Sequence, residues 1–292
     1  MTRINRAVEL LAQGQPVYYD SVPLEARSYE GGRELAGTWA DYLTYDMEHS
    51  AFDPTRLGEF MRGLVDGGPT RSGHRTPAVI VTLPVPGVDE AVMRANTWLC
   101  QQVLATGVHG LLLCHAESAE AVRVFVEACR YPFAPAHPAL SVGRRGSSGQ
   151  KQAAAIWGLS VPDYLARADP WPLNPNGELL LGLKIENVRA LANCDATTSI
   201  PGIAFAEWGP GDMGMSMGYP DQHDEPYPPE MLAARSRVLA ACQAAGLAFL
   251  SSVSPENVTR MLDEGVRIGS ASQGGREAAE IGRRHTGRTM PW

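Results

Sequence analysis

Two carboxylates stand where apolar segments end, about one β-α unit apart in the chain. Glu186 follows the apolar run 179–185, and Asp212 lies in a Gly-Pro-Gly turn shortly after the run 203–206. In a parallel α/β sheet, residues just past the carboxyl ends of neighbouring strands share one face, so we expect both side chains to meet around a divalent metal ion. For each carboxylate alone, a helix cap, a turn or a surface charge is an open alternative.

The segment Asp46-Met47-Glu48-His49 follows another apolar run. An Asp three residues before a His can bind one ring nitrogen and leave the other as a general base. The alternative is a helix-capping Asp beside an exposed His. His115 also ends an apolar run, where a satisfied core histidine is the favoured interpretation and a site residue the alternative.

Lys184 lies two residues before Glu186, so both side chains point to the same side of the strand. A Schiff-base lysine is one interpretation, but nearby carboxylates would keep this amine charged, which favours an ion pair or a substrate contact. Arg144 and Arg145 lie in a glycine-rich run and are candidates for binding a carboxylate or phosphate of a substrate. The alternative for both arginines is solvation.

Short apolar segments alternate with helix-like segments of period about 3.6 almost throughout the chain. We expect strands at 16–21, 41–46, 78–83, 110–115, 179–185, 203–206, 248–252 and 266–271, and helices at 53–65, 89–105, 119–129, 229–245, 256–263 and 275–284. Strand, crossover helix and parallel strand repeated in this way predict a (β/α)8 TIM barrel, of the α/β class. A doubly wound open sheet is the rival, but neither GxGxxG nor GxxxxGK[ST] follows any expected strand.

Residues 131–177 break the alternation, because they are rich in proline and contain the run Gly143-Arg144-Arg145-Gly146-Ser147-Ser148-Gly149. A connection of this length inside a barrel is usually functional, so we expect an active-site insertion here. The chain shows no internal repeat and no low-complexity linker. We therefore expect one domain over residues 1–292.

The composition excludes several classes of protein. The 292 residues are 44% hydrophobic and 20% charged, with a formal net charge of -7 and no Lys/Arg run that could follow a phosphate backbone, so nucleic acid is not an expected partner. No apolar run approaches the roughly 20 residues of a membrane span, and no membrane partner is expected. Five widely spaced cysteines without a CxxC pair are typical of reduced thiols, and we expect a cytoplasmic protein.

Taken together, these motifs resemble the metal-dependent (class II) 2-oxo-acid aldolases typified by 4-hydroxy-2-oxoheptanedioate aldolase, in the phosphoenolpyruvate/pyruvate barrel superfamily with macrophomate synthase as a relative. The resemblance runs from about Val17 to the last helix. It is carried by residues 41–49 (DYLTYDMEH), 130–132 (RYP), 143–149, 162–165 (PDYL), 184–186 (KIE) and 209–212 (GPGD).

The resemblance implies a carbon-carbon lyase that cleaves a 4-hydroxy-2-oxo acid to pyruvate, or a related 2-oxo acid, and an aldehyde. Glu186 and Asp212 would be the ligands of Mg2+, Mn2+ or Co2+, which suits a hard cation bound by oxygens. The substrate carboxylate would lie against the turn Gly209-Pro210-Gly211-Asp212, where glycines permit close approach. His49, oriented by Asp46, would take the C4 hydroxyl proton through a water at the metal. The family also implies a homohexamer, as a trimer of dimers that exchange their last helix, and a role in the catabolism of aromatic compounds.

The chain departs from the family pattern at positions that bear on the reaction. Thr82 stands where the third strand normally ends in an arginine, and losing one such donor in related sites costs on the order of 2.7 to 4 kcal/mol. Lys184 replaces a neutral amide and is a candidate catalytic residue that returns the missing positive charge. Tyr19, Trp208, Thr82 and Arg145 are candidate substrate contacts. These departures leave open a second reaction of the same enolate, namely decarboxylation, hydration or a bond formation like that of macrophomate synthase, and a non-catalytic metabolite-binding barrel is the third hypothesis.

Overall fold

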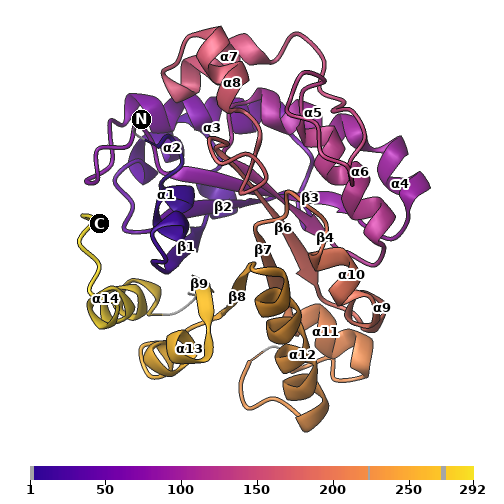
Figure 1. Ribbon diagram of the computed structural model, residues 1–292. Helices are drawn as coiled ribbons and strands as arrows, with labels where there is room; N and C mark the ends of the chain where they lie inside the picture. The colour runs from indigo at the N-terminus through magenta and orange to yellow at the C-terminus, as the bar shows by residue number, and fades with distance from the viewer. Residues whose placement is uncertain (1–2, 223, 271–273) are drawn as a thin grey trace.

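Eight parallel strands close into a barrel in the computed structural model, which describes residues 3–222, 224–270 and 274–292 (Figure 1). The ring runs β1-β2-β3-β4-β6-β7-β8-β9, and β9 pairs with β1 to close it. The bounds are β1 Val17–Ser21, β2 Tyr42–Asp46, β3 Ala78–Pro86, β4 Gly110–Cys114, β6 Leu179–Ile185, β7 Phe205–Trp208, β8 Ala248–Ser252 and β9 Val266–Ser270. The two-residue strand β5 (Pro170–Trp171) lies beside the start of β6.

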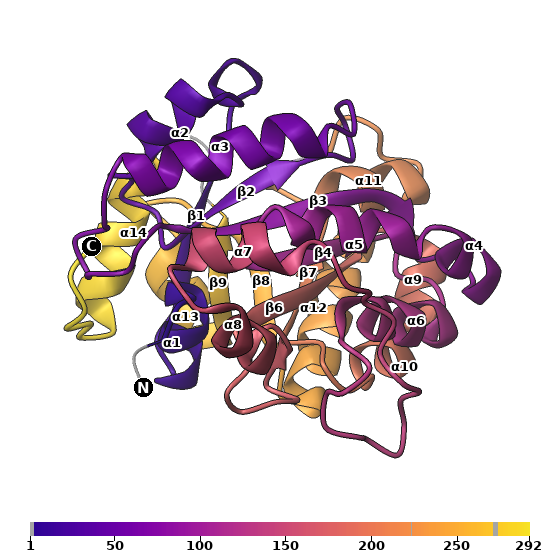
Figure 2. The ribbon, with the colours of Figure 1, turned by 90° about the horizontal axis from the view of Figure 1, so that it is seen from above.

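Helices surround the ring, as the two views at right angles show (Figures 1 and 2). They are α1 Arg6–Ala12, η1 Leu24–Ala26, α2 Tyr29–Leu35, α3 Pro54–Asp66, α4 Glu90–Ala95, α5 Thr97–Ala105, α6 Ala119–Cys129, α7 Gln150–Trp157, α8 Val161–Arg167, α9 Val188–Ala192, α10 Cys194–Thr198, α11 Pro210–Met217, α12 Pro229–Ala245, α13 Val258–Glu264 and α14 Gly275–His285. No helix in the described ranges is both long and apolar enough to cross a bilayer.

The barrel separates a small inner core from a larger outer core. Along β6, Leu181 and Leu183 point outward and pack with the helices, whereas Leu180 points inward and packs with Phe205. A side chain at Gly182 would come within 2.1 Å of the Phe205 ring, so the absence of a Cβ there lets one aromatic ring fill the barrel interior. Alternation along the strand then places Lys184 on the same inward face, toward the carboxyl end.

The predicted barrel is confirmed, with differences at the ends of elements. The expected strand 203–206 forms at Phe205–Trp208, because Trp208 still pairs with Ile185 of β6. The expected helix 89–105 is broken at Asn96, whose side-chain amide donates to Val92 O (2.8 Å) and ends α4. Ala271, expected at the end of the last strand, lies outside the described residues.

The long connection 131–177 lies at the amino ends of the strands. Its helix α7 places Trp157 Nε1 against Gly107 O (2.9 Å) and stacks the indole on His109, both just before β4. At its far end, Gly177 O accepts from Arg3 (2.8 Å), ahead of α1. A segment between a helix and the next strand returns to the amino end of the barrel, so within this chain the insertion is not at the carboxyl-end mouth.

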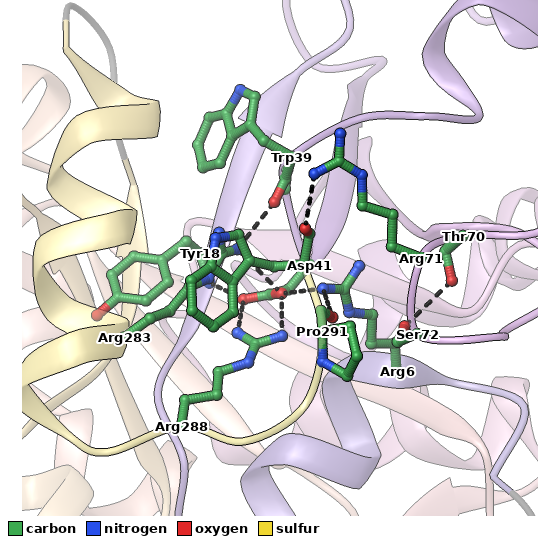
Figure 3. A network of polar contacts seen from close by, with 12 residues as sticks. Arg6, Tyr18, Trp39, Asp41, Thr70, Arg71, Ser72, Arg283, Arg288 and Pro291 are labelled. Atoms are coloured by element: carbon green, nitrogen blue, oxygen red, sulfur yellow. Dashed lines mark hydrogen bonds and ion pairs between the residues drawn. The ribbon is translucent and has the colours of Figure 1, made fainter.

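A buried charge cluster joins α1, the start of β2 and the C-terminal segment on the amino side of the barrel (Figure 3). Asp41 accepts a two-point contact from Arg288 (2.7 and 2.8 Å) and lies 3.1 Å from nitrogens of both Arg283 and Arg6. Asp41 Oδ2, one of the two oxygens that Arg288 contacts, also accepts from the Tyr18 backbone N–H (2.9 Å). These contacts fix α14 and the residues after it against a barrel, and the exchange of α14 between subunits stays a prediction.

Candidate active site

Lys184 is the centre of a buried ion-pair cluster at the carboxyl end of β6. Its Nζ lies 2.6 Å from Glu48 Oε2 and 2.7 Å from Glu186 Oε2, and the residue is only 8% exposed. Burial alone would lower the pKa of this ammonium, but Glu207, Glu186 and other carboxylates outweigh that effect and raise it. Lys184 therefore stays charged, and the structure brings together two residues that lie 136 positions apart.

Glu186 is fully buried at the junction of three strand ends. Its Oε1 accepts from the backbone N–H of His115, after β4, at 2.9 Å. Gly209, after β7, comes so close that an added Cβ would lie 3.1 Å from Oε2. Burial raises the pKa of the Glu186 carboxyl, while Lys184 acts in the opposite direction. The glycine is required here because a side chain would fill the space beside the carboxylate.

The loop after β2 presents His49 in the predicted arrangement. Asp46 Oδ1 accepts from the backbone N–H groups of Glu48 (2.8 Å) and His49 (3.3 Å), which folds the loop back on its own side chain. Asp46 Oδ2 lies 3.0 Å from His49 Nδ1, and the imidazole is 64% exposed. The Asp therefore orients the ring and leaves Nε2 accessible, as a general base requires.

The turn after β7 brings Asp212 into the first turn of α11. Gly209 precedes the helix, Pro210 occupies its first turn, and Gly211 follows. Asp212 is near enough to raise the pKa of Glu207, as a minor contribution behind burial. The order of the turn thus keeps Asp212 on the same barrel end as Glu186.

Thr82 and Tyr19 both belong to the inner face of the barrel. Thr82 continues the inward positions Ala78 and Ile80 of β3 and is buried. Tyr19 stacks on Tyr42, with ring centroids 4.9 Å apart. Burial and then the charge of a nearby glutamate raise the Tyr19 pKa.

Two of the predicted substrate contacts are not brought to this site within the chain. Arg145 is buried in the 131–177 insertion, where it donates to Tyr164 Oη (2.8 Å) and lies over the Tyr131 ring. Trp208 is 2% exposed in the outer core, with its ring edge-on to Tyr227. Arg145 lies with the rest of the insertion at the amino end of the barrel. The Trp208 side chain points outward from β7, toward the helices.

Sequence reasoning assigned no role to two of the acidic residues of the site and took one histidine for a core residue. Glu48 contacts Lys184, and His115 contacts Glu186. Glu207 faces inward in register with Lys184, and burial raises its pKa to about 7. The available signal was parity, since Glu207 lies two residues after the inward Phe205.

Among the residues that the structure describes, two groups of side chains have ligand atoms close enough for a metal ion. Asp46, Glu48 and His49 form one, and Glu48, Cys114 and Glu186 form the other. Cys114 donates to Leu83 O (3.2 Å), and burial raises the pKa of its thiol, which disfavours a thiolate ligand.

The oxygens of Glu186 fit a hard cation better. Its Oε2 is buried and, among the described residues, accepts no hydrogen bond, although the Lys184 ammonium faces it as an ion pair. It also borders the space kept open by Gly209. The residues present therefore suit a divalent cation that prefers carboxylate oxygens.

The sequence of this chain is similar to those of known proteins. The HpcH/HpaI aldolase/citrate lyase family matches residues 32–278. A 2-keto-3-deoxy-L-rhamnonate aldolase from Klebsiella pneumoniae subsp. pneumoniae is 34% identical over 215 residues, which are 73% of this chain and 68% of that protein.

Solved structures confirm the fold. An HpcH/HpaI aldolase/citrate lyase family protein from Burkholderia cenocepacia J2315 superimposes with a TM-score of 0.72 at 22% identity, covering 96% of this chain and 97% of the other. Macrophomate synthase gives a TM-score of 0.65 at 22% identity, with 97% and 88% covered. The resemblance drawn from the sequence motifs is confirmed: this chain belongs to the HpcH/HpaI aldolase/citrate lyase family, whose members are enzymes of the aldolase and lyase type.

Proposed function

We propose that the chain is a divalent-metal-dependent carbon-carbon lyase that cleaves a 4-hydroxy-2-oxo acid into pyruvate, or a related 2-oxo acid, and an aldehyde. The observation that carries this proposal is the cluster of Glu48, Lys184 and Glu186 at the carboxyl end of the barrel. The Klebsiella relative supports it, since its name describes a 2-oxo acid with a deoxygenated C3. We infer a substrate of that chemical class.

Glu186 and Asp212 are the residues that would hold the cation. When bound, a divalent cation supplies Lewis acidity for the 2-oxo group of the substrate. Mg2+, Mn2+ and Co2+ all suit two carboxylates and water. The Lys184 ammonium already faces Glu186 Oε2 at 2.7 Å, so this carboxylate would be shared between two cations.

The remaining groups divide the proton and charge transfers. His49, oriented by Asp46, would take the proton of the C4 hydroxyl through water; the C3–C4 bond then breaks, the C4 oxygen becomes the aldehyde, and the electron pair passes to the 2-oxo acid as its enolate. Lys184 stabilises the negative charge that develops on the 2-oxo oxygen, and it does so much better than the neutral hydroxyl of Thr82 would. The backbone N–H groups of Gly211 and Asp212 would bind the substrate carboxylate. Because Lys184 stays charged, it does not act as a Schiff-base nucleophile.

A second candidate is another reaction of the same enolate, such as decarboxylation, hydration or the formation of a new bond. The specific observation behind it is Thr82, which is buried on the inner face at the position where an arginine was expected. Lys184 approaches the site from β6 instead of β3, so the stabilising charge comes from a different direction.

The test is exchange of the C3 hydrogens of pyruvate in deuterated water, followed by NMR with added Mn2+ or Mg2+ and with chelator. Metal-dependent exchange that is lost in Glu186→Ala and His49→Ala supports the lyase. Absence of exchange in wild-type protein that binds Mn2+ contradicts it and makes the second candidate the first.

The cellular and oligomeric context belongs to the same proposal. We infer a cytoplasmic homohexamer of exchanged dimers and a role in the catabolism of small 2-oxo acids, including those from aromatic compounds. The mass of the native protein in solution, measured by light scattering, tests the hexamer.

A further inference from the structure

His115 has a backbone conformation that side chains rarely adopt. Its φ is 45°, in the left-handed region, and of the non-glycine residues described it shares a positive φ with Ser148 alone. The conformation is held by bonds on both sides: its own N–H donates to Glu186 Oε1 (2.9 Å), and the Ala116 N–H donates to Lys184 O (3.1 Å). Such strained positions cluster at functional sites, where the surrounding structure determines them.

The neighbours of the imidazole determine its tautomer. Asn187 Oδ1 accepts from the first amides of α9, Arg189 N (3.0 Å) and Ala190 N (2.9 Å), so its Nδ2 is the atom that faces His115. Nδ2 lies 3.2 Å from His115 Nδ1 and also donates to Glu117 Oε1 (2.9 Å). An amide nitrogen can only donate, and the other neighbour of Nδ1, Glu186 Oε1, lies farther away at 3.4 Å and makes no hydrogen bond to it, so Nδ1 is the acceptor of the Asn187 amide. We therefore assign the ring proton to Nε2.

The Asn187 amide that contacts His115 is itself held in place by Glu117 and Arg189. Arg189 binds both oxygens of Glu117, at 2.7 and 2.9 Å, which holds the carboxylate that positions the Asn187 amide. The ring of His115 is thus oriented through Asn187 and Glu117, in the way that a second residue usually orients a catalytic histidine.

The proton on Nε2 points toward the ion-pair cluster and is not used there. The facing acceptor, Glu48 Oε1, is 3.7 Å away, beyond hydrogen-bond reach, and no described residue makes a hydrogen bond to Nε2. The side chain is 33% exposed, so a ligand in the mouth of the barrel can reach it. The His115 Nε2–H is therefore a hydrogen-bond donor that is held in place beside Glu186 and has no protein acceptor among the described residues. It offers the kind of donor that is missing where Thr82 replaces the expected arginine.

We propose that His115 is a further catalytic residue, which donates from Nε2 to the 2-oxo oxygen of the substrate as negative charge develops on it. This inference rests on the proposed function and deepens it, because it names the second donor to the enolate oxygen. No proton is transferred: the N–H bond stays intact, and the hydrogen bond strengthens as the C3–C4 electron pair moves onto the oxo group. Lys184 and His115 would then share the role of the missing arginine.

Three substitutions test this donor. His115→Gln and His115→Met have unbranched chains of similar length and the same left-handed strain, but only Gln places an N–H near the Nε2 position. His115→Asn tolerates the left-handed backbone better, yet its shorter amide reaches only the Nδ1 position. We expect Met and Asn to lower kcat for C3 exchange by about 10²- to 10³-fold, with Gln retaining most of it. KM for pyruvate and the affinity for Mn2+, measured by titration, should stay unchanged in all three.

A structural role through Glu186 predicts the opposite pattern. If Gln loses as much as Met, or if Mn2+ affinity falls in step with kcat, His115 only supports Glu186 and the inference is overturned. Calorimetric binding of oxalate, a planar analogue of the pyruvate enolate, separates this result from the proposed function. Weaker oxalate binding in Met than in Gln supports His115 even if the wild-type protein exchanges no proton. Equal oxalate binding in the wild type and all three variants overturns the inference even if exchange is observed.

Discussion

Replacing Glu207 with Gln should stabilise the protein, and the gain should depend on pH. The carboxylate faces into the barrel, in register with Lys184, and no hydrogen bond or ion pair to it is found among the described residues. Burial, with help from Glu186 and Glu48, raises its pKa from 4.5 to about 7, a value that already includes the opposing effect of Lys184. Each pKa unit corresponds to about 1.4 kcal/mol, so ionised Glu207 costs the folded state about 3 kcal/mol.

The direction of the pH dependence follows from the difference in proton affinity of Glu207 between the folded and unfolded states. The folded state binds it more tightly than the unfolded state, so the cost is complete above about pH 7 and disappears as the pH falls toward 4.5. Gln has the same shape and no charge to bury. The free energy of unfolding of Glu207→Gln should therefore exceed that of the wild type by about 3 kcal/mol at pH 8 and equal it near pH 4.5.

Urea unfolding at several pH values, with chelator present so that no cation alters the local field, measures this difference. Glu25→Gln, at an exposed carboxylate in η1, offers the matched control, because the same chemical change there removes no charge from the interior of the protein. A gain in Glu207→Gln that is the same at pH 8 and pH 4.5, or a loss at pH 8, would refute the reasoning.

Three further predictions concern Asp41, the two candidate metal ligands and Lys184. Asp41→Asn should lose about 3 to 5 kcal/mol of unfolding free energy, because three buried guanidiniums keep their charge without a carboxylate. Burial alone would raise the pKa of Asp41, but the arginines outweigh burial and lower it. The loss, measured by urea unfolding, should therefore persist from pH 8 down to pH 3.8, the ordinary pKa of an aspartate. Glu186→Ala and Asp212→Ala should each abolish Mn2+ binding and metal-dependent turnover while circular dichroism shows a folded barrel, and an unaffected rate in either excludes it as a ligand. Lys184→Gln should reduce kcat more than Mn2+ affinity, and an equal loss of both in turnover and titration experiments would contradict its role in charge stabilisation.

The barrel was predictable because its signal is local. Apolar strands, capped helices and their order along the chain are properties of short segments, and eight repeats of this unit leave few ways to bury every apolar face. Strand alternation placed Lys184 and Glu186 on one side of β6. The three-residue spacing of Asp46 and His49 predicted their contact in the loop after β2. The break at Asn96 was not predicted, since one side-chain bond to Val92 O decides it.

The insertion 131–177 was expected at the active site from its length and composition. Its position in the order of elements indicates a different location. It lies between a helix and a strand, and such connections return to the amino end of a barrel, whereas active sites form at the carboxyl end. Arg145 went with it and became a buried partner of Tyr164. Trp208 lies on the opposite face of β7 from Glu207 and is buried in the outer core, so within this chain it does not line the barrel interior.

By itself, the sequence determined the class of fold, the family motifs, and the pairing of residues that lie a few positions apart. Only the tertiary structure decided that Glu48 reaches Lys184 across 136 positions, that Glu207 shares their interior, and that His115 bends back to Glu186. The physical reason is that these contacts depend on strand register and barrel closure, which are set by the packing of the whole chain and carry no periodic signal in any one segment.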